Sequence, residues 1–179
     1  MIENLFSLKG RVALVTGGSR GIGKMIAQGF VESGSKVYIS ARKADACDAT
    51  AAELSKFGEC ISLPQDISTV AGAKALAEQI YKLEGKLDIL VNNAGAAWAA
   101  DFDEFPEHGW DKVMNLNVKS PFFLTQALHA ALKKAASADK PAKVINICSI
   151  DGIKLNPLET YSYHASKASL LYLTKRMAA

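Results

Sequence analysis

Short runs of apolar and largely β-branched residues alternate along the chain with longer stretches in which apolar residues recur at helical spacing. Runs of the first kind are typical of strands buried on both faces of a sheet, and stretches of the second kind are typical of helices that cover it. The pattern predicts strands over residues 11–16, 36–40, 60–64, 87–92 and 143–148. It predicts helices over residues 22–33, 44–57, 69–83 and 110–136.

This strict alternation of strand and helix indicates an α/β fold built from βαβ units. Because the crossover between two parallel strands is right-handed, successive units place helices on both faces of one sheet. We expect a doubly wound parallel sheet of the Rossmann type with the strand order 3-2-1-4-5. Ligands bind such sheets at the C-terminal ends of the strands, so functional side chains are expected at that edge.

Composition narrows the class of protein further. A chain of 179 residues, 49% of them hydrophobic, predicts a single domain over residues 1–179. The net charge of +3 is mild and the basic residues are scattered, which argues against a nucleic-acid partner. The chain begins MIENLFSLKG, which does not resemble a signal peptide, and it contains no run of about 18 apolar residues that would span a membrane. We therefore expect a cytoplasmic protein with no membrane partner.

The three cysteines indicate neither a metal site nor a disulfide. Cys47, Cys60 and Cys148 lie far apart and form no C-x-x-C pair, so they are predicted to be reduced, buried thiols. Cys148 and Ser149 are neighbours at the end of an expected strand and point to opposite faces, which favours a packed core thiol over a reactive one.

The stretch TGGSRGIG, residues 16–23, lies between the first expected strand and the first expected helix. Gly17 can make the turn off the strand, while Gly21 and Gly23 let the backbone approach a pyrophosphate at the positive N-terminus of the helix. The spacing differs from the G-x-G-x-x-G fingerprint and lacks the G-K-[ST] ending of a P-loop, so nucleotide hydrolysis is disfavoured. We predict a dinucleotide site here, and an ordinary tight turn is the alternative.

The end of the second expected strand indicates which nicotinamide cofactor fits. An acidic residue there bonds the ribose 2′-hydroxyl of NAD(H), whereas an arginine accommodates the 2′-phosphate of NADP(H). The chain has Arg42 and no acidic residue before Asp45, and Arg20 can supply a second guanidinium. We predict NADP(H), and a solvated helix start is the alternative.

The stretch YSYHASK, residues 161–167, concentrates side chains that can exchange protons. Residues four apart lie on one face of a helix, and only Tyr163 and Lys167 meet that condition as a phenol and ammonium pair. A phenol with an ordinary pKa of about 10 works better near neutral pH if a nearby cation favours the phenolate. Tyr161 has no such partner and is predicted to be a packing aromatic, and His164 points away from this face. A polar helix face without chemistry is the alternative.

Two further polar residues lie where chemistry is expected. Ser149 follows the fifth expected strand, so its hydroxyl can donate to a carbonyl oxygen at the ligand edge; a simple turn serine is the alternative. Asn117 interrupts the apolar stripe of the helix expected over residues 110–136. Pro121 has no N–H for the Asn117 carbonyl and is expected to kink this helix, which frees that carbonyl. A kinked helix with a locally bonded asparagine is the alternative.

Together, TGGSRGIG, the NNAG of residues 92–95, Asn117, Ser149 and Tyr163-x-x-x-Lys167 resemble the short-chain dehydrogenase/reductase family over essentially the whole chain. Within the family, the chain is most similar to bacterial 3-oxoacyl-thioester reductases, including the type associated with rhamnolipid synthesis. The resemblance implies an NADP(H)-dependent oxidoreductase that transfers a hydride between nicotinamide and a carbonyl or secondary alcohol carbon. It also implies a small carbonyl substrate, carried as an acyl carrier protein or coenzyme A thioester, and a homodimer or homotetramer.

The resemblance assigns roles to residues of this chain. Ser149 would polarise the substrate carbonyl, Tyr163 would transfer the proton and Lys167 would hold the ribose. Asn117 would hold a water linked to the lysine, and Asp66 would contact the adenine. With the motifs above, it predicts a cofactor-binding set of Gly17, Ser19, Arg20, Gly21, Ile22, Gly23, Arg42, Asp66, Ile67, Asn93, Ala94, Gly95, Tyr163 and Lys167.

The chain departs from the family at its end. It stops at Ala179, within the helix that carries Tyr163 and Lys167, whereas family members continue through further strands and a substrate loop. We therefore expect a C-terminally incomplete domain whose fifth strand is a bare edge. Two alternatives stay open: a catalytically silent NADP(H)-binding or regulatory protein, and a sugar, polyol or small ketone as substrate.

Overall fold

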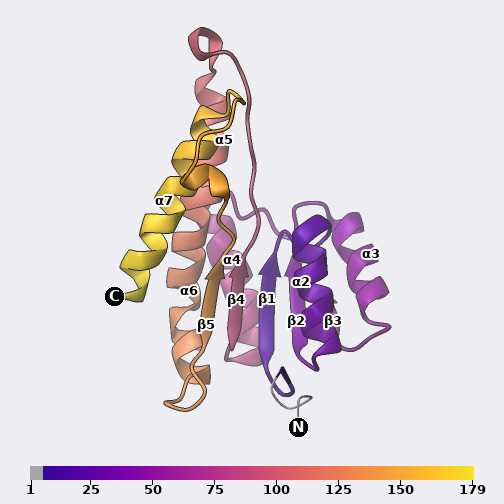
Figure 1. Ribbon diagram of the computed structural model, residues 1–179. Coiled ribbons are helices and arrows are strands. Elements are labelled where there is room, and N and C mark those ends of the chain that lie inside the picture. Colours follow the sequence, from indigo (N-terminus) through magenta and orange to yellow (C-terminus); the bar gives the residue numbers. More distant parts are fainter. Residues whose placement is uncertain (1–5) are drawn as a thin grey trace.

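The computed structural model describes residues 6–179 and shows one sheet of five parallel strands flanked by helices (Figure 1). The strand order is β3-β2-β1-β4-β5, which confirms the predicted fold class and order. Residues 1–5, where part of the expected absence of a signal peptide falls, lie outside the described residues. The strands are β1 (Val12–Thr16), β2 (Lys36–Ser40), β3 (Cys60–Ser62), β4 (Ile89–Asn92) and β5 (Lys143–Asn146).

The helices predicted over residues 22–33, 44–57 and 69–83 are present within three residues of those bounds. The stretch predicted as one helix over residues 110–136 is helical from Glu107 to Ala135, but it changes helical register partway along. It forms α5 (Glu107–Met114), a π-helical turn η2 (Asn115–Lys119) and α6 (Ser120–Ala135). The other elements are α2 (Gly21–Glu32), α3 (Ala44–Leu54), α4 (Val70–Glu84), α7 (Tyr161–Ala178), and the short 3-10 turns η1 (Phe102–Glu104) and η3 (Ile150–Gly152).

The π-helical turn has a cause in the sequence. Pro121 has no N–H, so the α-helical bond to the Asn117 carbonyl cannot form. The N–H of Ser120 instead reaches back five residues to the Asn115 carbonyl, which makes one wider turn before α6. The helix thus changes register close to the position where Pro121 was expected to kink it. Asn117, in the middle of this turn, lies in the interior with 1% of its surface exposed.

The sheet has a separate core on each face, as the alternation of side chains along its strands requires. Val12 and Leu14 of β1 pack with residues of α4 and α6, while Ala13 and Val15 pack with residues of α2 and α3. Each large side chain buried in this way contributes about 1.5–3 kcal/mol. Because β1 pairs with both β2 and β4, the loops that follow β1 and β4 leave from buried, well-anchored strands.

Charged side chains close the N-terminal edge of the sheet. The buried carboxylate of Asp88 accepts hydrogen bonds from the Arg11 guanidinium at 2.9 Å and from the Val12 N–H at 3.0 Å. Tyr38 donates to Glu84, and burial together with this carboxylate raises the pKa of Tyr38 to about 12. These contacts brace the N-terminal edge, whereas ligands of doubly wound sheets bind at the opposite, C-terminal edge.

The outer strand β5 is thinly covered. Within the described residues it pairs with β4 alone, and Val144 and Ile145 are 37% and 41% exposed. Cys47 and Cys60 are buried as predicted, whereas the predicted burial of Cys148 is wrong. This thiol is only half-buried, because it follows the exposed strand.

The part of the chain that the structure describes has no helix long and apolar enough to cross a membrane. Over the same residues there is no group of three or more His, Cys, Asp or Glu side chains arranged to hold a metal ion. That the chain forms one domain, incomplete at its C-terminus, stays a prediction.

Candidate active site

The glycine-rich turn after β1 folds back on the start of α2. The N–H groups of Gly17 and Gly18 donate to the Ser40 carbonyl at 2.7 and 3.2 Å, which holds the turn against the end of β2. Gly17 has a φ of +65°, and a Cβ on Gly23 would lie 2.3 Å from the Gly17 carbonyl oxygen. Only glycine fits these two positions. In contrast, a Cβ on Gly21 would meet nothing within 4 Å, so one side of the turn is open.

The N-terminus of α2 lies at this turn and has no side-chain cap. Arg20 is the N-cap residue but makes no capping hydrogen bond, and the first turn contains no acidic residue. The first N–H groups of the helix therefore carry partial positive charge without a side-chain acceptor. Ser19 is held by Thr50, whose hydroxyl donates to the Ser19 carbonyl at 2.9 Å, and Ile22 is 57% exposed. A cofactor pyrophosphate fits this site, because it brings acceptor oxygens and negative charge to these donors.

Thr16 and Asn93 lock the turn to the segment after β4. The Thr16 hydroxyl accepts the N–H groups of Asn93 and Ala94 at 3.0 and 3.1 Å. Asn93 Nδ2 donates to the carbonyls of Thr16 and Gly17 at 2.9 and 3.2 Å, while Gly95 is exposed nearby. Asn93 and Ala94, both predicted to bind cofactor, thus brace the turn. Thr16 is absent from the predicted site, because a threonine that ends a strand reads as an ordinary β-branched position.

The ends of β2 and β3 bring part of the predicted adenosine side together. Burial alone would raise the pKa of Asp66, but hydrogen bonds from Ser68 and the nearby Arg42 guanidinium lower it overall. Asp66 accepts the Ser68 N–H at 2.9 Å. Ile67 differs from the prediction in one respect: its side chain is buried in the core at 6% exposure, so only its backbone can face a cofactor.

Ser149 follows β5 and is the N-cap residue of η3. Its Oγ accepts the Asp151 N–H at 3.2 Å, which leaves the hydroxyl proton free to donate to another oxygen. The η3 turn packs against α7 beside Lys167, since a Cβ on Gly152 would lie 2.8 Å from the Lys167 carbonyl carbon. Ser149 and Lys167 therefore belong to adjoining turns.

Tyr163 and Lys167 are neighbours on α7, as their spacing predicts. The Lys167 Nζ lies 5.6 Å from the centre of the Tyr163 ring. It donates to the Ile147 carbonyl at 2.7 Å, a bond that no sequence pattern signals. Lys167 is 6% exposed, and burial lowers its pKa. The Ile147 carbonyl thus holds the Lys167 ammonium near the Tyr163 ring.

Asn117 joins α7 to the segment after β4. Its Oδ1 accepts the Ala96 N–H at 2.8 Å, and its Nδ2 donates to the Ala96 carbonyl at 2.9 Å. Its Nδ2 also donates to Ser166 Oγ at 2.9 Å. The four residues predicted as catalytic therefore lie in one region at the C-terminal ends of β4 and β5. Ser166, which lies within YSYHASK, is absent from the predicted site.

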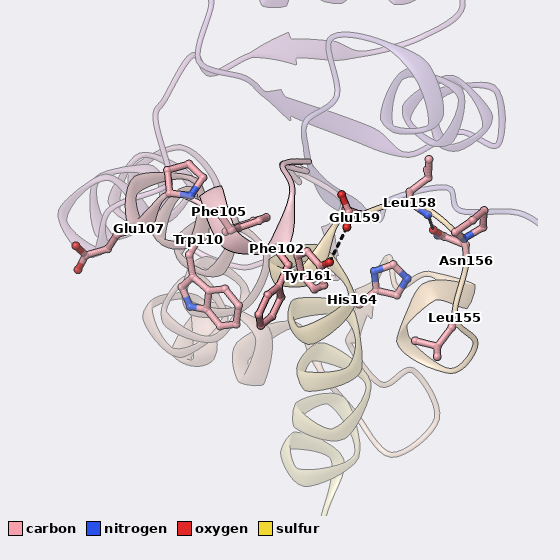
Figure 2. A pocket seen from close by; sticks show the side chains of 12 residues that line it. Phe102, Phe105, Glu107, Trp110, Leu155, Asn156, Leu158, Glu159, Tyr161 and His164 are labelled. Atoms are coloured by element: carbon pink, nitrogen blue, oxygen red, sulfur yellow. Dashed lines mark hydrogen bonds between the residues drawn. The ribbon is translucent and has the colours of Figure 1, made fainter.

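A large aromatic cavity of about 790 Å³ lies on a different face of α7 (Figure 2). Tyr161 packs edge-on against Phe102 and Phe105, with ring centres 5.5 and 5.7 Å apart. Its hydroxyl donates to Glu159 at 2.9 Å, and His164 lines the same cavity. Tyr161 is a packing aromatic, as predicted, and His164 turns away from the phenol and ammonium pair.

The fold and the site define a class of protein. A doubly wound sheet that presents an open glycine-rich turn, together with a phenol, an ammonium and a hydroxyl at the same edge, is typical of nicotinamide-dependent oxidoreductases. Residues 11–179 match the short chain dehydrogenase family. The chain belongs to this family and is an oxidoreductase, which confirms the predicted family and enzyme class.

Two curated relatives and one solved structure show what the chain is similar to within the family. A rhamnolipid biosynthesis 3-oxoacyl-[acyl-carrier-protein] reductase of Pseudomonas aeruginosa is 52% identical over 173 residues, covering 97% of this chain and 68% of that protein. A 2-dehydro-3-deoxy-D-gluconate 5-dehydrogenase of Dickeya dadantii is 35% identical, with 99% of this chain and 68% of that protein covered. The solved Pseudomonas aeruginosa RhlG/NADP active-site complex is similar with a TM-score of 0.94 at 52% identity, over 97% of this chain and 68% of that chain.

Proposed function

We propose that the chain is an NADP(H)-dependent reductase that acts on the keto group of 3-oxoacyl thioesters. The observation that carries the proposal is that the Lys167 ammonium lies 5.6 Å from the centre of the Tyr163 ring, while the turn that Ser149 caps packs against Lys167. This pair and the open glycine-rich turn both follow the C-terminal ends of strands, where ligands of such sheets bind. The 52% identity to a 3-oxoacyl-[acyl-carrier-protein] reductase supports the substrate class. An acyl carrier protein or coenzyme A thioester as the carried form, and a cytoplasmic location, stay predictions.

The cofactor is NADP(H). A solved relative at 52% identity is an NADP complex, and Arg42 is exposed beyond β2 with no acidic residue before Asp45. A guanidinium there can make forked contacts with a 2′-phosphate, whereas NAD(H) would require an acidic residue to bond the ribose 2′-hydroxyl. When bound, the cofactor supplies the hydride from its nicotinamide ring.

The protein supplies the proton and polarises the carbonyl. Ser149 donates its free hydroxyl proton to the substrate oxygen, and Tyr163 gives its phenolic proton to that oxygen as negative charge develops there. The Lys167 ammonium lies 5.6 Å from the centre of the Tyr163 ring, so it brings positive charge close to the group that gives up its proton. Because burial lowers the pKa of Lys167, its proton is held less tightly than that of an exposed lysine. This suits a group that returns a proton to the tyrosine.

Asn117 takes a different part from these three residues. Its side chain is committed to Ala96 and Ser166, so any part in proton transfer falls to its backbone carbonyl. Pro121 offers no N–H to that carbonyl at the α-helical position, and a water that relays protons to Lys167 would bind there.

Two rival functions make different predictions. The first rival is a dehydrogenase of sugar acids, which the 35% identity to a 2-dehydro-3-deoxy-D-gluconate 5-dehydrogenase supports. A catalytically silent protein would keep the cofactor site but has no need for Ser149, Tyr163 and Lys167 together. Each rival can be separated from the proposal in one assay.

The protein is expected to oxidise NADPH with an acetoacetyl thioester, and to do so faster than with a keto sugar acid or a simple ketone. Cofactor absorbance, followed at equal concentrations of NADPH and NADH, measures both preferences. Faster turnover of the sugar acid would overturn the thioester assignment, and faster reaction with NADH would overturn the argument from Arg42. Tight NADPH binding without turnover of any carbonyl would favour the silent protein.

We also propose that α7 forms part of an interface with a second copy of this chain, in a homodimer or homotetramer. Tyr161 and Tyr172 are about three helical turns apart, so they lie on one face of α7, and Tyr172 is 75% exposed. Leu155 and Leu158, at 92% and 66% exposure, extend this apolar surface beside the aromatic cavity. Exposed apolar patches of this kind are typical of interaction sites, and a second copy would cover them.

Replacing Tyr172 with glutamate is expected to shift the protein to a smaller species. A carboxylate buried in the interface would weaken association by about 2 kcal/mol or more, which is about 30-fold. Light scattering after size exclusion measures the mass. The matched control is Tyr81→Glu on α4, where a tyrosine that is 54% exposed should be replaced without effect. A parent protein that is monomeric throughout, or equal shifts in both variants, would refute the interface.

A further inference from the structure

Ser166 is a buried serine with both sides of its hydroxyl engaged. It lies one residue before Lys167 on α7 and is 0% exposed. Its Oγ donates to the Tyr163 carbonyl at 2.7 Å and accepts a proton from Asn117 Nδ2 at 2.9 Å. A hydroxyl has one proton to give and lone pairs to accept with, so the two bonds are compatible at once.

The other end of this link reaches the cofactor side of the site. The Asn117 amide makes two hydrogen bonds with the backbone of Ala96, at 2.8 and 2.9 Å. Two residues earlier, the Ala94 N–H bonds the Thr16 hydroxyl at the root of the glycine-rich turn. Two buried side chains, Asn117 and Ser166, therefore connect the backbone beside the cofactor turn to the backbone of Tyr163.

We propose that Ser166 is a positioning residue for proton transfer. The proposal rests on the proposed function, in which Tyr163 is the proton donor. The Ser166 hydroxyl is held between the Asn117 amide and the Tyr163 carbonyl. These two bonds fix how the first turns of α7 are rotated about the helix axis and how closely they pack against the segment after β4. The Tyr163 phenol is thereby aimed at the carbonyl oxygen, which takes the proton when the carbonyl carbon receives the hydride. Misplacement of a reacting group by about 1 Å can lower turnover by about 10²-fold.

The same helix offers a matched control. Ser162 lies one helical turn before Ser166, on the same face, and is also 0% exposed. Within the described residues, however, its Oγ has no hydrogen-bond partner. Removing the Ser162 hydroxyl breaks no bond, whereas removing the Ser166 hydroxyl breaks two and leaves a buried amide proton of Asn117 unpaired.

The test compares Ser166→Ala, Ser162→Ala and Ser166→Thr by turnover at saturating NADPH, by NADPH affinity from fluorescence titration, and by thermal unfolding. Ser166→Ala is expected to lose about 10- to 10²-fold in kcat while its NADPH affinity stays near that of the parent. Ser162→Ala should match the parent in both, and Ser166→Thr, which restores the hydroxyl, should recover turnover. Unfolding midpoints show that each variant is folded at the assay temperature.

Each other outcome has a definite meaning. Equal turnover of Ser166→Ala and Ser162→Ala would overturn the proposal, and so would a loss of NADPH affinity as large as the loss of kcat, because Ser166 would then support the fold of the cofactor site. Tyr163→Phe in the same assay distinguishes a failure of the proposed function from a failure of the positioning role of Ser166. If that variant keeps full turnover, the proposed function fails; if it is inactive while Ser166→Ala is fully active, only the positioning role fails.

Discussion

Replacing Tyr163 with phenylalanine is expected to lower turnover by about 10²- to 10⁴-fold, the usual contribution of general acid–base catalysis, while NADPH affinity stays near that of the parent. The ring and its contact with the Lys167 ammonium are retained in this variant. Within the described residues no hydrogen bond involves the Tyr163 hydroxyl, so its removal breaks no bond of the protein. Stopped-flow or steady-state cofactor absorbance measures turnover, and fluorescence titration measures NADPH binding.

Tyr161 provides the control for this variant on the same helix. Its hydroxyl donates to Glu159, and its ring packs in the aromatic cavity away from Lys167. Tyr161→Phe removes a phenolic hydroxyl only two residues from Tyr163 and should leave turnover unchanged. If both variants retain turnover, Tyr163 is not the proton donor; if both lose it equally, the loss reports on the packing of α7 and the catalytic assignment fails.

Features with local physical causes could be predicted from the sequence. Tyr163 and Lys167 are neighbours because residues four apart meet on any α-helix, and Gly23 is required by a turn whose two sides are close in sequence. The bounds of the strands are predicted less well, because the apolar pattern does not show where the hydrogen bonds between strands begin. Leu87 is fully buried and continues the apolar run, yet β4 begins only at Ile89, where pairing with β1 starts. Apolar pattern reports burial, and burial extends beyond the ladder of hydrogen bonds.

Features that depend on distant partners could not be predicted. Asn117 and Ser166 are 49 residues apart, and Thr16 and Asn93 are 77 residues apart, so no spacing rule connects them. Their side chains act as links only because the sheet order brings the ends of β1 and β4 side by side, and because α7 returns to the π-helical turn. The exposure of Cys148 is a similar case, since alternation gives the face of a residue but not what covers that face.

Replacing Gly23 with alanine is expected to weaken NADPH binding by about 10- to 100-fold, through the backbone and not through a lost contact. The new Cβ would lie 2.3 Å from the Gly17 carbonyl oxygen and 2.4 Å from Asn93 Nδ2, so the turn must move away from α2. Overpacking of this kind costs about 1–3 kcal/mol. If this cost is paid by the conformation that binds NADPH, the affinity falls by about 10- to 100-fold. Fluorescence titration with NADPH measures the affinity, and denaturant unfolding measures the loss of stability.

Gly29 lies later in the same helix and separates the clash from the general effect of alanine. A Cβ there would meet nothing within 4 Å, and Gly29 is exposed without a positive φ. Gly29→Ala is therefore expected to raise the free energy of unfolding by about 0.5–1 kcal/mol, because alanine loses less backbone entropy in a helix, with unchanged NADPH affinity. Parent-like affinity in Gly23→Ala would mean that the turn does not hold the pyrophosphate. A weakened affinity in Gly29→Ala would mean that the start of α2 responds to any change along the helix, and that the close approach of Gly23 to Gly17 is not the cause.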